Sequence, residues 1–546
     1  MKNKTLKIIP VGGWGEVGKN MTVYEYDDQI LIVDAGMMFP DNDMIGIDYI
    51  IPDFEYVKQN ASKVKGIIIT HGHEDHIGAI SHLLEVVNAP IYGTPLTLGL
   101  IENKLNRRSY TGAIKLQKVL AGETVQIGPF KVDFFHVCHS IPDSVGFGID
   151  TPAGLIVQTG DYKFDHSPVD NWPTDYAKLA EFAQRGVLAL LADSTNAENP
   201  GWTPSERGIN AAFDQVFQNA KGRIIVATFA SLISRIIQIY DTAVKFGRKV
   251  AFVGLSMTEN IKIAQELGYV DFDEKSVVSL DVALKMPAKD VVLMVTGSQG
   301  EPLSILGRLA NGTNKRFEIQ TGDTVVLSSH PIPGNEEPVY RAINRLMEKG
   351  AEVIYESLAP VHVSGHASQE EMKLLLHIVR PRYLIPAHGE LRMLKAHARL
   401  AQSIGMDEKQ IAIVENGRVI NFNHGELTLG ERIPGGYVFV DGTGVGDIDR
   451  STMREREQLS NDGVVVLNLV LEPKNGAFRE LNIQSKGFIA DEEADTLFAE
   501  MRRRVERLMV SPSNNLERDL QNMAKGLIYD DTRRQPVIFT NVTRGQ

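Results

Sequence analysis

The sequence predicts an α/β protein in which an αββα sandwich is interrupted by an inserted α/β domain and followed by a small C-terminal α/β domain. Three observations support this fold class. Up to about residue 200 the chain is rich in strand patterns, and histidine and aspartate residues lie in the loops between them. From about residue 205 strand and helix patterns alternate, as expected of a parallel sheet covered by helices. The histidine-rich pattern resumes at 362–388, so we interpret the middle block as an insertion.

The domain limits follow from these changes in pattern and from composition. With 546 residues the chain has room for about three or four domains. After a stretch rich in glycine and aspartate, an apolar run at 464–471 and a basic helical pattern at 501–507 indicate a small separate domain. We expect five parts: a first sandwich segment at 1–204, the insert at 205–355, a second sandwich segment at 356–434, a linker at 435–450 and the C-terminal domain at 451–546.

Composition narrows the possible settings. The net charge of -12 argues against binding of nucleic acid over the whole surface, although local basic patches such as Lys104 and Arg107 remain. The sequence has no run of about 18 apolar residues, and residues 1–10 lack the features of a signal peptide. We therefore expect a cytoplasmic protein without a membrane anchor. The single cysteine, Cys138, excludes an intrachain disulfide and is interpreted as a buried strand thiol.

The first glycine-rich motif predicts turns and not a nucleotide site. Residues 13–18 spell GWGEVG, which matches the GxGxxG dinucleotide fingerprint. That fingerprint requires a helix to begin at once, so that its N-terminus holds the pyrophosphate. Here the alternating segment 21–26 and the apolar segment 29–33 predict a β-meander instead.

The run HGHEDH at 71–76 predicts the start of a metal site. It directly follows the apolar stretch 66–70, which is typical of a buried strand. His71 and His73 face one side of an extended segment, whereas Asp75 and His76 lie beyond a turn and can reach a second ion. A lone histidine is more often structural, but four possible ligands in six positions favour metal binding. Imidazole and carboxylate together suit zinc or manganese.

Isolated histidine and aspartate residues after other strand patterns supply the remaining ligands. His139 follows a strand pattern at 132–137, and Asp161 and His388 follow similar patterns. The expected assignment has two ligand sets and a bridge: His71, His73 and His139; Asp75, His76 and His388; and Asp161 with a hydroxide between the ions. This arrangement predicts a hydrolytic centre, because two cations roughly 3.5–4 Å apart activate a shared water and clamp the reacting oxygens.

The other histidines are interpreted as structural or solvated because of their positions. They fall in helical patterns, in a loop or in a turn: His82, His166, His377, His397 and His424. We also leave His136 outside the site.

The insert is predicted to hold a parallel sheet because strand and helix patterns alternate in it. Strand patterns at 223–228, 249–253, 290–295 and 323–327 are separated by helical patterns such as 233–246.

Three loops in or after the insert are candidates for binding phosphate. The loops at 295–302 and 328–336 leave apolar strands with glycine and serine, whose free N–H groups and hydroxyls suit an anion, although plain turns share this composition. The stretch HVSGHAS at 362–368 precedes a helix predicted at 369–379, so a phosphate could lie at that helix N-terminus. The candidate contacts there are His362, Ser364, His366 and Ser368.

These motifs together resemble a known family. The ligand motifs are similar to those of the metallo-β-lactamase fold, and Asp193, His366 and His388 resemble the added motifs of its nucleic-acid-processing β-CASP branch. HGHEDHIGAI, HSIPD, TGSQGEP, PIPGNE, HVSGHASQEE and PAHGE resemble the bacterial ribonuclease J family over essentially the whole chain. The resemblance implies a two-metal phosphodiesterase that matures and degrades RNA, usually as a 5′-to-3′ exonuclease with a preference for 5′-monophosphate ends and sometimes as an endonuclease. It also implies homodimers or homotetramers formed through the C-terminal domain, and other RNA-decay proteins as partners.

Carried over residue by residue, the resemblance implies the same seven metal ligands and adds Asp193 and His366. One of these two would position the metal ligands and the scissile phosphate, and the other would protonate the leaving 3′-oxygen, without an assignment of which does which. The expected catalytic residues are Asp75, Asp161, Asp193 and His366.

The resemblance also implies how the 5′ end of RNA is held, and here the chain departs from the family. Ser231 joins Ser364 and His366 as an expected phosphate contact. Many relatives carry Asn and His where this chain has Leu232 and Ser234, and Asn where it has His330. The grip on the 5′ end is therefore expected to differ.

Two other functions are weighed as alternatives. A small-molecule metallohydrolase does not need the insert, Asp193 or the HVSGHAS loop. A catalytically silent RNA-binding or scaffold subunit of an RNA-degradation assembly is expected to have lost ligands, whereas all seven are present. DNA is harder to exclude as substrate, because neither metals nor a phosphate pocket reads the 2′-hydroxyl, but the resemblance favours RNA. Zinc is the expected metal and manganese also suits the ligands.

Overall fold

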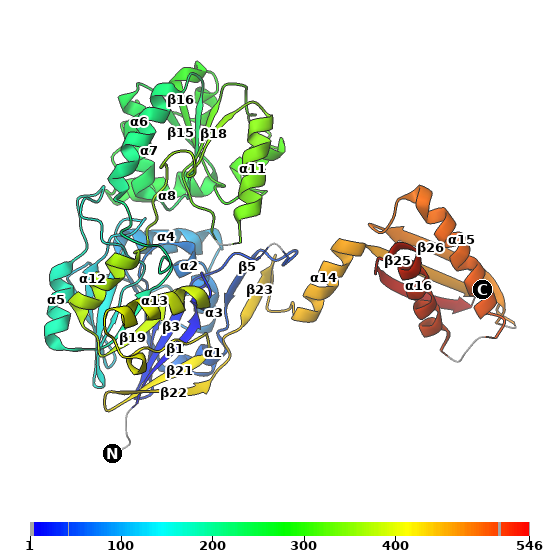
Figure 1. The fold of residues 1–546 in the computed structure, drawn as a ribbon, viewed down its shortest axis with the longest axis horizontal. Coiled ribbons are helices and arrows are strands. Elements are labelled where there is room, and N and C mark those ends of the chain that lie inside the picture. Colours follow the sequence, from blue (N-terminus) through cyan, green and yellow to red (C-terminus); the bar gives the residue numbers. More distant parts are fainter. Residues whose placement is uncertain (1–4, 42, 333, 475, 512–514, 545–546) are drawn as a thin grey trace. The chain divides into compact units, whose positions relative to one another are not determined.

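The computed structural model describes residues 5–41, 43–332, 334–474, 476–511 and 515–544 (Figure 1). They belong to two units that are described separately. One unit falls within Met1–Phe39 and Tyr49–Val438, and the other within Pro40–Asp48 and Phe439–Gln546.

Two sheets form the centre of the first unit. The larger sheet has the order β22-β21-β1-β3-β4-β6-β7-β8. Its strands are β1 (Leu6–Gly12), β3 (Met21–Tyr26), β4 (Gln29–Val33), β6 (Val64–Ile68), β7 (Ile91–Gly93), β8 (Leu116–Lys118), β21 (Arg418–Asn423) and β22 (Glu426–Arg432). The smaller sheet has the order β19-β13-β12-β11-β10-β9. Its strands are β9 (Thr124–Ile127), β10 (Phe130–His136), β11 (Val145–Thr151), β12 (Gly154–Gln158), β13 (Val187–Asp193) and β19 (Tyr383–Ala387).

The two sheets pack face to face, with helices outside, and the predicted αββα order is confirmed. Leu31 of the larger sheet and Phe134 and Ile385 of the smaller sheet share one fully buried apolar cluster. The outer faces belong to separate clusters that include helix residues: Ile67 and Leu83 of α3 in one, and Val157 and Leu375 of α12 in the other. The helices of this part are α1 (Glu55–Gln59), α2 (Glu74–Ile77), α3 (Ile80–Val86), α4 (Pro95–Arg107), α5 (Tyr176–Arg185), α12 (Gln369–Val379) and α13 (Leu391–Ser403).

The glycine-rich segment near the N-terminus forms turns, as predicted. Between β1 and β3 the chain holds only the short strand β2 (Trp14–Gly15), which pairs with β20 (Gly389–Glu390). Gly13, Gly15 and Gly18 have positive φ angles of 84°, 86° and 103°, which glycine adopts without steric cost. The β-meander predicted there is confirmed.

The insert contains a parallel five-stranded sheet with the order β15-β16-β14-β17-β18. Figure 1 shows it in green, with helices on both sides of the sheet. Its strands are β14 (Ile224–Ala227), β15 (Lys249–Val253), β16 (Val291–Val295), β17 (Thr324–Leu327) and β18 (Glu352–Ile354). Its helices are α6 (Ile209–Asn219), α7 (Ile233–Lys245), α8 (Leu255–Glu266), α9 (Leu280–Ala283), α10 (Ile305–Asn311) and α11 (Glu336–Glu348).

One buried arginine joins the insert to the two segments that connect it with the sandwich. Arg235 of α7 is fully buried, and its guanidinium donates to Glu206 Oε2 at 2.8 Å and to the Val361 carbonyl oxygen at 2.9 Å. Glu206 lies just before α6, the first helix of the insert, and Val361 lies after β18, its last strand. A desolvated guanidinium with a paired carboxylate gives a specific contact, because losing either partner leaves a buried charge.

The second unit contains a small sheet with the order β26-β25-β27. Strand β25 alternates between buried and half-buried residues, and its buried side packs on α15 and α16. The elements are α14 (Arg450–Asp462), β25 (Val464–Leu471), β26 (Phe478–Lys486), α15 (Asp491–Leu508), α16 (Leu516–Thr532) and β27 (Val537–Arg544). The stretch predicted as a linker, 435–450, contains the antiparallel pair β23 (Tyr437–Asp441) and β24 (Gly444–Val445). The division of the chain into five parts stays a prediction.

Candidate metal centre

The predicted metal ligands gather where strands of both sheets end. Strands β12, β13 and β19 are parallel neighbours, so their carboxyl ends meet at one edge of the smaller sheet. Asp161, Asp193 and His388 lie at or just after these three ends. Strand β6 of the larger sheet leads into HGHEDH, where Asp75 and His76 lie in the short helix α2. Residues far apart in the sequence are thereby brought into one site.

The first ligand set consists of three imidazoles that face one another. His73 Nδ1 lies 3.0 Å from His71 Nε2 and 3.1 Å from His139 Nε2. Burial and the nearby His76 lower the pKa of His71 well below its usual value, and burial lowers the pKa of His73 to about 4. Burial and His73 likewise lower the pKa of His139. Imidazoles that stay neutral at physiological pH have a free nitrogen lone pair for a metal ion.

The second ligand set combines carboxylates with imidazoles. His76 Nε2 lies 3.4 Å from Asp75 Oδ2, and His388 Nε2 lies 3.5 Å from the same oxygen. His388 Nδ1 lies 2.7 Å from Asp161 Oδ1. Oxygen and nitrogen donors in one buried group suit a borderline cation such as Zn²⁺ or Mn²⁺.

Asp161 lies between the two sets. Its Oδ2 is 3.2 Å from His76 Nε2 in the second set, and 3.6 Å and 3.7 Å from the Nε2 atoms of His71 and His139 in the first. Burial alone would raise the pKa of Asp161, but the neighbouring His388 and His76 lower it well below its usual value. The carboxylate is therefore ionised and placed to serve both sets.

The donor atoms fit a pair of divalent cations. In each of three groups, the possible ligand atoms lie within 4.8 Å of one another. The groups are His71, His73 and His139; Asp75, His76, Asp161 and His388; and Asp161, Asp193, His366 and His388. The first two coincide with the sets that were assigned from the sequence, and the role of each residue as a ligand stays a prediction.

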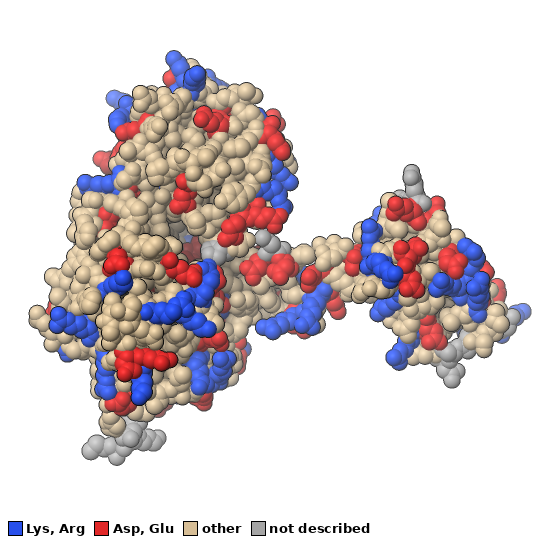
Figure 2. All heavy atoms as spheres, viewed as in Figure 1, with Lys and Arg blue, Asp and Glu red and all other residues tan. Residues whose placement is uncertain are grey.

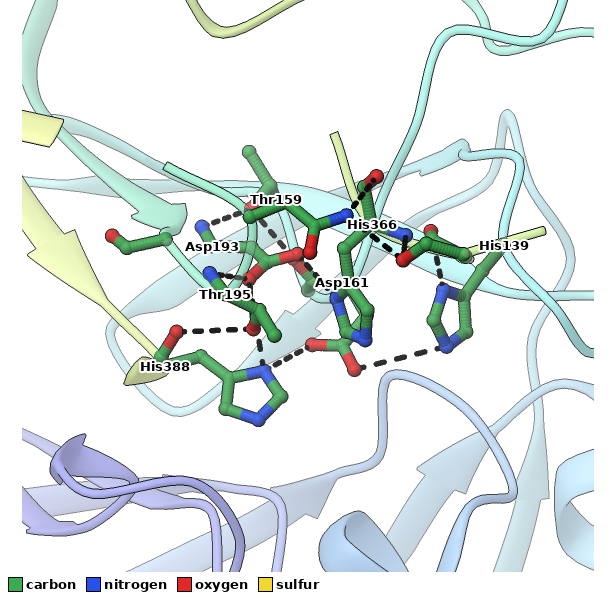
Figure 3. Close-up of polar contacts among 12 residues, drawn as sticks. His139, Thr159, Asp161, Asp193, Thr195, His366 and His388 are labelled. Atoms are coloured by element: carbon green, nitrogen blue, oxygen red, sulfur yellow. Dashed lines mark hydrogen bonds and ion pairs between the residues drawn. The ribbon is translucent and has the colours of Figure 1, made fainter. Parts of the chain in front are cut away.

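Asp193 and His366 form a hydrogen-bonded pair beside the ligands. His366 Nδ1 lies 2.7 Å from Asp193 Oδ2, and Asp193 Oδ1 accepts from the backbone N–H of Thr195 at 2.8 Å (Figure 3). Burial opposes protonation of His366, but the Asp193 carboxylate outweighs it and raises the pKa of His366 to about 9. The pair can hold a proton next to the ligands at neutral pH.

Models of known protein families match most of the chain. Residues 14–197 match the metallo-beta-lactamase superfamily, and residues 221–346 match the ribonuclease J beta-CASP domain. Residues 350–413 match the Zn-dependent metallo-hydrolase RNA specificity domain, and residues 451–545 match the ribonuclease J C-terminal domain.

Relatives that align over nearly their full length are named ribonuclease J or ribonuclease J2. The chain is 39% identical to ribonuclease J2 of Bacillus subtilis, over 99% of both chains. It is 40% identical to ribonuclease J of Thermus thermophilus, over 99% of this chain and 95% of that one. The chain belongs to the ribonuclease J family. Its fold also resembles a crystal structure of a protein of unknown function from Enterococcus faecalis V583, with a TM-score of 0.54, 15% identity, and coverage of 76% of this chain and 100% of that one.

Two residues that contact the ligands of this ribonuclease J family member were missed by the sequence analysis. Asp34 Oδ2 lies 2.8 Å from His76 Nδ1 and can orient that ring. Asn20 Nδ2 lies 3.1 Å from His76 Nε2 and 3.2 Å from both His388 Nε2 and Asp75 Oδ2. Asp34 follows β4 directly, so the strand-end signal used for Asp161 could have found it.

The candidate phosphate contacts in the ribonuclease J loop at 362–368 differ from one another in their hydrogen-bond partners. Ser364 Oγ accepts from Asn196 Nδ2 at 2.8 Å and from the backbone N–H of His366 at 3.2 Å. Ser368 is the N-cap residue of α12 and its hydroxyl lies 2.8 Å from Thr203 Oγ1. Ser364 thus lies beside the pair formed by Asp193 and His366.

His362 and Ser231 are the remaining predicted contacts of this loop region. Burial and the nearby Arg235 lower the pKa of His362 to about 3, and its Nδ1 is buried without a hydrogen-bond partner. Ser231 is half-buried in the turn before α7. Their roles in binding RNA stay predictions.

Proposed function

We propose that this member of the ribonuclease J family hydrolyses RNA phosphodiester bonds with two divalent cations, held by His71, His73, Asp75, His76, His139, Asp161 and His388. The observation that carries the proposal is the position of Asp161 between two buried ligand sets. Metal dependence and ribonuclease activity agree with the full-length relatives and the family models. The Zn-dependent description of residues 350–413 supports zinc, and Mn²⁺ is the second candidate.

The proposed cleavage mode is 5′-to-3′ exonuclease action with additional endonuclease activity, in RNA maturation and decay. The arrangement of the loop at 362–368 supports an end-binding site, because Ser364 lies beside the pair formed by Asp193 and His366. A phosphate held by Ser364 would place the first phosphodiester bond near the ligands. His362, Ser368 and Ser231 are proposed as further contacts.

The chemistry divides between the cations and the protein. When bound, the cations would polarise the scissile phosphate and lower the pKa of an attacking water. The protein keeps its imidazole ligands in orientation: the carbonyl oxygen of Gly365 lies 2.8 Å from His139 Nδ1, and Asp34 is bonded to His76 Nδ1. With each Nδ1 donating outward, both rings direct the Nε2 lone pair into the site.

His366 is proposed as the general acid and Asp193 as the residue that positions it. Because Nδ1 donates to Asp193 Oδ2, a protonated His366 carries its second proton at Nε2. The attacking water loses one proton to solvent as its oxygen bonds to phosphorus, the bond from phosphorus to the 3′-oxygen breaks, and the Nε2 proton of His366 passes to that oxygen. The products are a 3′-hydroxyl and a 5′-phosphate.

The deciding experiment follows product lengths from one internally labelled RNA with a 5′-hydroxyl, monophosphate or triphosphate end. The parent protein, Asp75→Ala and the surface control Asp150→Asn are compared in Mn²⁺, in Zn²⁺ and in EDTA. We expect metal-dependent release of mononucleotides from the monophosphate RNA, near-complete loss in Asp75→Ala and normal activity in the control. Internal fragments alone would refute exonuclease action, and full activity of Asp75→Ala would refute the ligand assignment.

The alternatives are not favoured. A silent subunit is at odds with the two clusters of possible ligand atoms, and a small-molecule hydrolase is at odds with full-length relatives named ribonuclease J. We propose RNA as substrate, a homodimer or homotetramer formed through the C-terminal domain, contacts with other RNA-decay proteins, and a cytoplasmic location. In the described part of the chain, no helix combines the length and the apolar character needed to cross a membrane.

A further inference from the structure

Two exposed tryptophans lie on neighbouring segments, one of which is bonded to the loop at 362–368. The chain has three tryptophans, and Trp14 is 3% exposed. The other two, Trp172 and Trp202, are 42% and 48% exposed. A large aromatic ring contributes most to stability when it is buried, so exposed rings that gather in one place indicate a binding surface.

The two tryptophans are on segments that are bonded to each other. Ser205 Oγ donates to the Ser167 carbonyl oxygen at 3.1 Å, and Arg207 Nε donates to the Pro168 carbonyl oxygen at 3.2 Å. The Arg207 guanidinium also donates to the Asn171 side chain, next to Trp172. The segments at 166–172 and 202–207 therefore form one continuous surface.

Neighbouring rings support the exposed ones. Trp172 stacks on His136, with ring centroids 3.9 Å apart and planes at 6°. His136 is 3% exposed, so it covers one face of Trp172 from the protein side. The ring centroid of the exposed His166 lies 6.0 Å from that of Trp202 and 6.0 Å from that of Tyr176. Rings fixed in this way lose little entropy when a further ring stacks on them.

The backbone at Trp202 is fixed to the loop that carries His366. Thr203 Oγ1 donates to the His366 carbonyl oxygen at 2.7 Å, and the Thr203 N–H donates to Glu371 Oε2 at 2.7 Å. The Gly201 carbonyl oxygen accepts from the N–H of Glu370 at 3.0 Å. A group bound on Trp202 would therefore lie at a fixed place relative to the Asp193 and His366 pair.

The charge distribution indicates that RNA binding needs an interaction in addition to electrostatic attraction. The chain has a net charge of -12, and on the face shown in Figure 2 lysine and arginine are interspersed with aspartate and glutamate. A protein that binds RNA only by neutralising its phosphates is expected to have a strongly basic surface. Stacking of bases on aromatic rings adds affinity without added positive charge, and it tolerates any sequence because every base has a π face.

We propose that His166, Trp172 and Trp202, here called the aromatic platform, bind unpaired bases of single-stranded RNA by stacking beside the metal centre. The proposal rests on the proposed ribonuclease function, because it names a further contact for the same substrate. Arg207 belongs to the segment at 202–207 and bonds it to Pro168 and Asn171, so its guanidinium can also pair with the phosphate backbone of an RNA strand bound there.

The test measures binding in EDTA, so that cleavage does not interfere. The full-length protein is titrated with a fluorescein-labelled oligoadenylate and with an abasic ribose-phosphate oligomer of equal length. The variants are Trp202→Leu, Trp202→Phe and, as a matched control, Tyr340→Leu, which removes a 47% exposed ring on α11. Circular dichroism confirms that each variant is folded.

We expect Trp202→Leu to raise the Kd for oligoadenylate about tenfold. Trp202→Phe should recover most of the affinity, Tyr340→Leu should bind as the parent does, and the abasic oligomer should bind equally to all four proteins. Quenching of tryptophan fluorescence by oligoadenylate should be weaker in Trp202→Leu.

Equal binding of oligoadenylate by the parent and Trp202→Leu would overturn the aromatic platform, and so would equal binding of oligoadenylate and the abasic oligomer by the parent. If the parent then still cleaves RNA in Mn²⁺, only the platform fails. If the parent shows the expected binding pattern but cleaves nothing, the platform holds and the proposed function fails.

Discussion

His139 Nδ1 lies 2.8 Å from the carbonyl oxygen of Gly365. A carbonyl oxygen only accepts, so this contact fixes the proton of His139 at Nδ1 and leaves Nε2 free toward His73. It also joins two parts of the centre, because His139 follows β10 whereas Gly365 belongs to the loop that carries His366. A shift of that loop would therefore move a predicted metal ligand.

Gly365→Ala should weaken metal binding. A Cβ atom at this position would lie 2.7 Å from both Cε1 and Nδ1 of His139, closer than side chains tolerate, so the ring would have to move. We expect about 10–100-fold weaker binding of the metal at the first ligand set, and partial recovery of cleavage at high metal concentration. Titration with Mn²⁺ or Zn²⁺, followed by calorimetry and by activity, measures both effects.

Gly208→Ala is the matched control for this change. A Cβ atom there would meet nothing within 4 Å, and Gly208 has an ordinary helical φ of -58°. The control should bind metal as the parent does. Parental metal affinity in Gly365→Ala would show that the loop does not orient His139.

Asp34→Asn should affect the second ligand set and spare the first. Asp34 bonds His76 Nδ1 through one oxygen and accepts from the Thr70 N–H at 2.8 Å through the other. The amide of asparagine can accept from only one of them, so the orientation of His76 is lost. We expect binding of one metal per chain to weaken about 10–100-fold while the other stays. Metal content after dialysis tests this, with Asp150→Asn as control, and an equal loss of both metals would contradict it.

Tyr269→Phe should loosen the attachment of the insert to the sandwich. The Tyr269 hydroxyl donates to Asp143 Oδ2 at 2.5 Å, and Asp143 is 4% exposed. Burial raises the pKa of Asp143, and without this donor the carboxyl group loses a main partner. We expect a loss of about 1–3 kcal/mol in stability and a rise in KM for long RNA that exceeds the fall in kcat. Tyr340→Phe, on the exposed side of α11, should change neither quantity, and an unaltered melting temperature in Tyr269→Phe would contradict the argument.

The lowered pKa of His82 should make the free energy of unfolding decrease in mild acid. Its Nε2 accepts from Arg108 Nη1 at 2.6 Å and lies 3.0 Å from the Tyr49 hydroxyl. Burial and Arg108 lower the pKa of His82 from 6.5 to about 4. Between these values the unfolded chain binds an additional proton, so the contribution of neutral His82 is complete above pH 6.5 and is lost as pH falls toward 4.

The expected slope is modest because solvent screens part of the interaction. We expect about 0.5–1 kcal/mol per pH unit in that window, below the full value for one proton. His82→Gln keeps an acceptor for Arg108 but does not titrate, so its free energy of unfolding should fall less between pH 6.5 and pH 5. Urea denaturation at several pH values gives the comparison, and parallel curves for the parent and His82→Gln would refute the assignment.

The candidate ligands of the metal centre could be predicted from the sequence. The contacts that hold these ligands in place could not. HGHEDH is recognisable because the ligands are adjacent, and Asp161 and His388 because each follows an apolar strand. The contact at Gly365 uses a backbone carbonyl, which every residue has, so no letter of the sequence marks it. Asn20 contacts His388 across 368 positions of sequence, with no local pattern to connect them.

The fold shows the same division between local and distant information. The strand patterns of the insert predict β14 to β17 closely, because alternation of strand and helix is a local signal. The order β15-β16-β14-β17-β18 depends on which strands pair, which periodicity does not determine. In the same way, β1 pairs with β21, so that the larger sheet is completed only after the insert has been passed.

The contacts of Arg235 should couple the unfolding of the insert to that of the sandwich. The guanidinium binds Glu206 and Val361, so the chain enters and leaves the insert past one side chain. Holding those two points together removes much of the loop-closure entropy of the intervening segment while the insert is native. If the insert opens, that restraint disappears and the ends of the sandwich segments separate. The sandwich and the insert should therefore melt in one cooperative transition, and separate expression of the insert should give a markedly less stable protein.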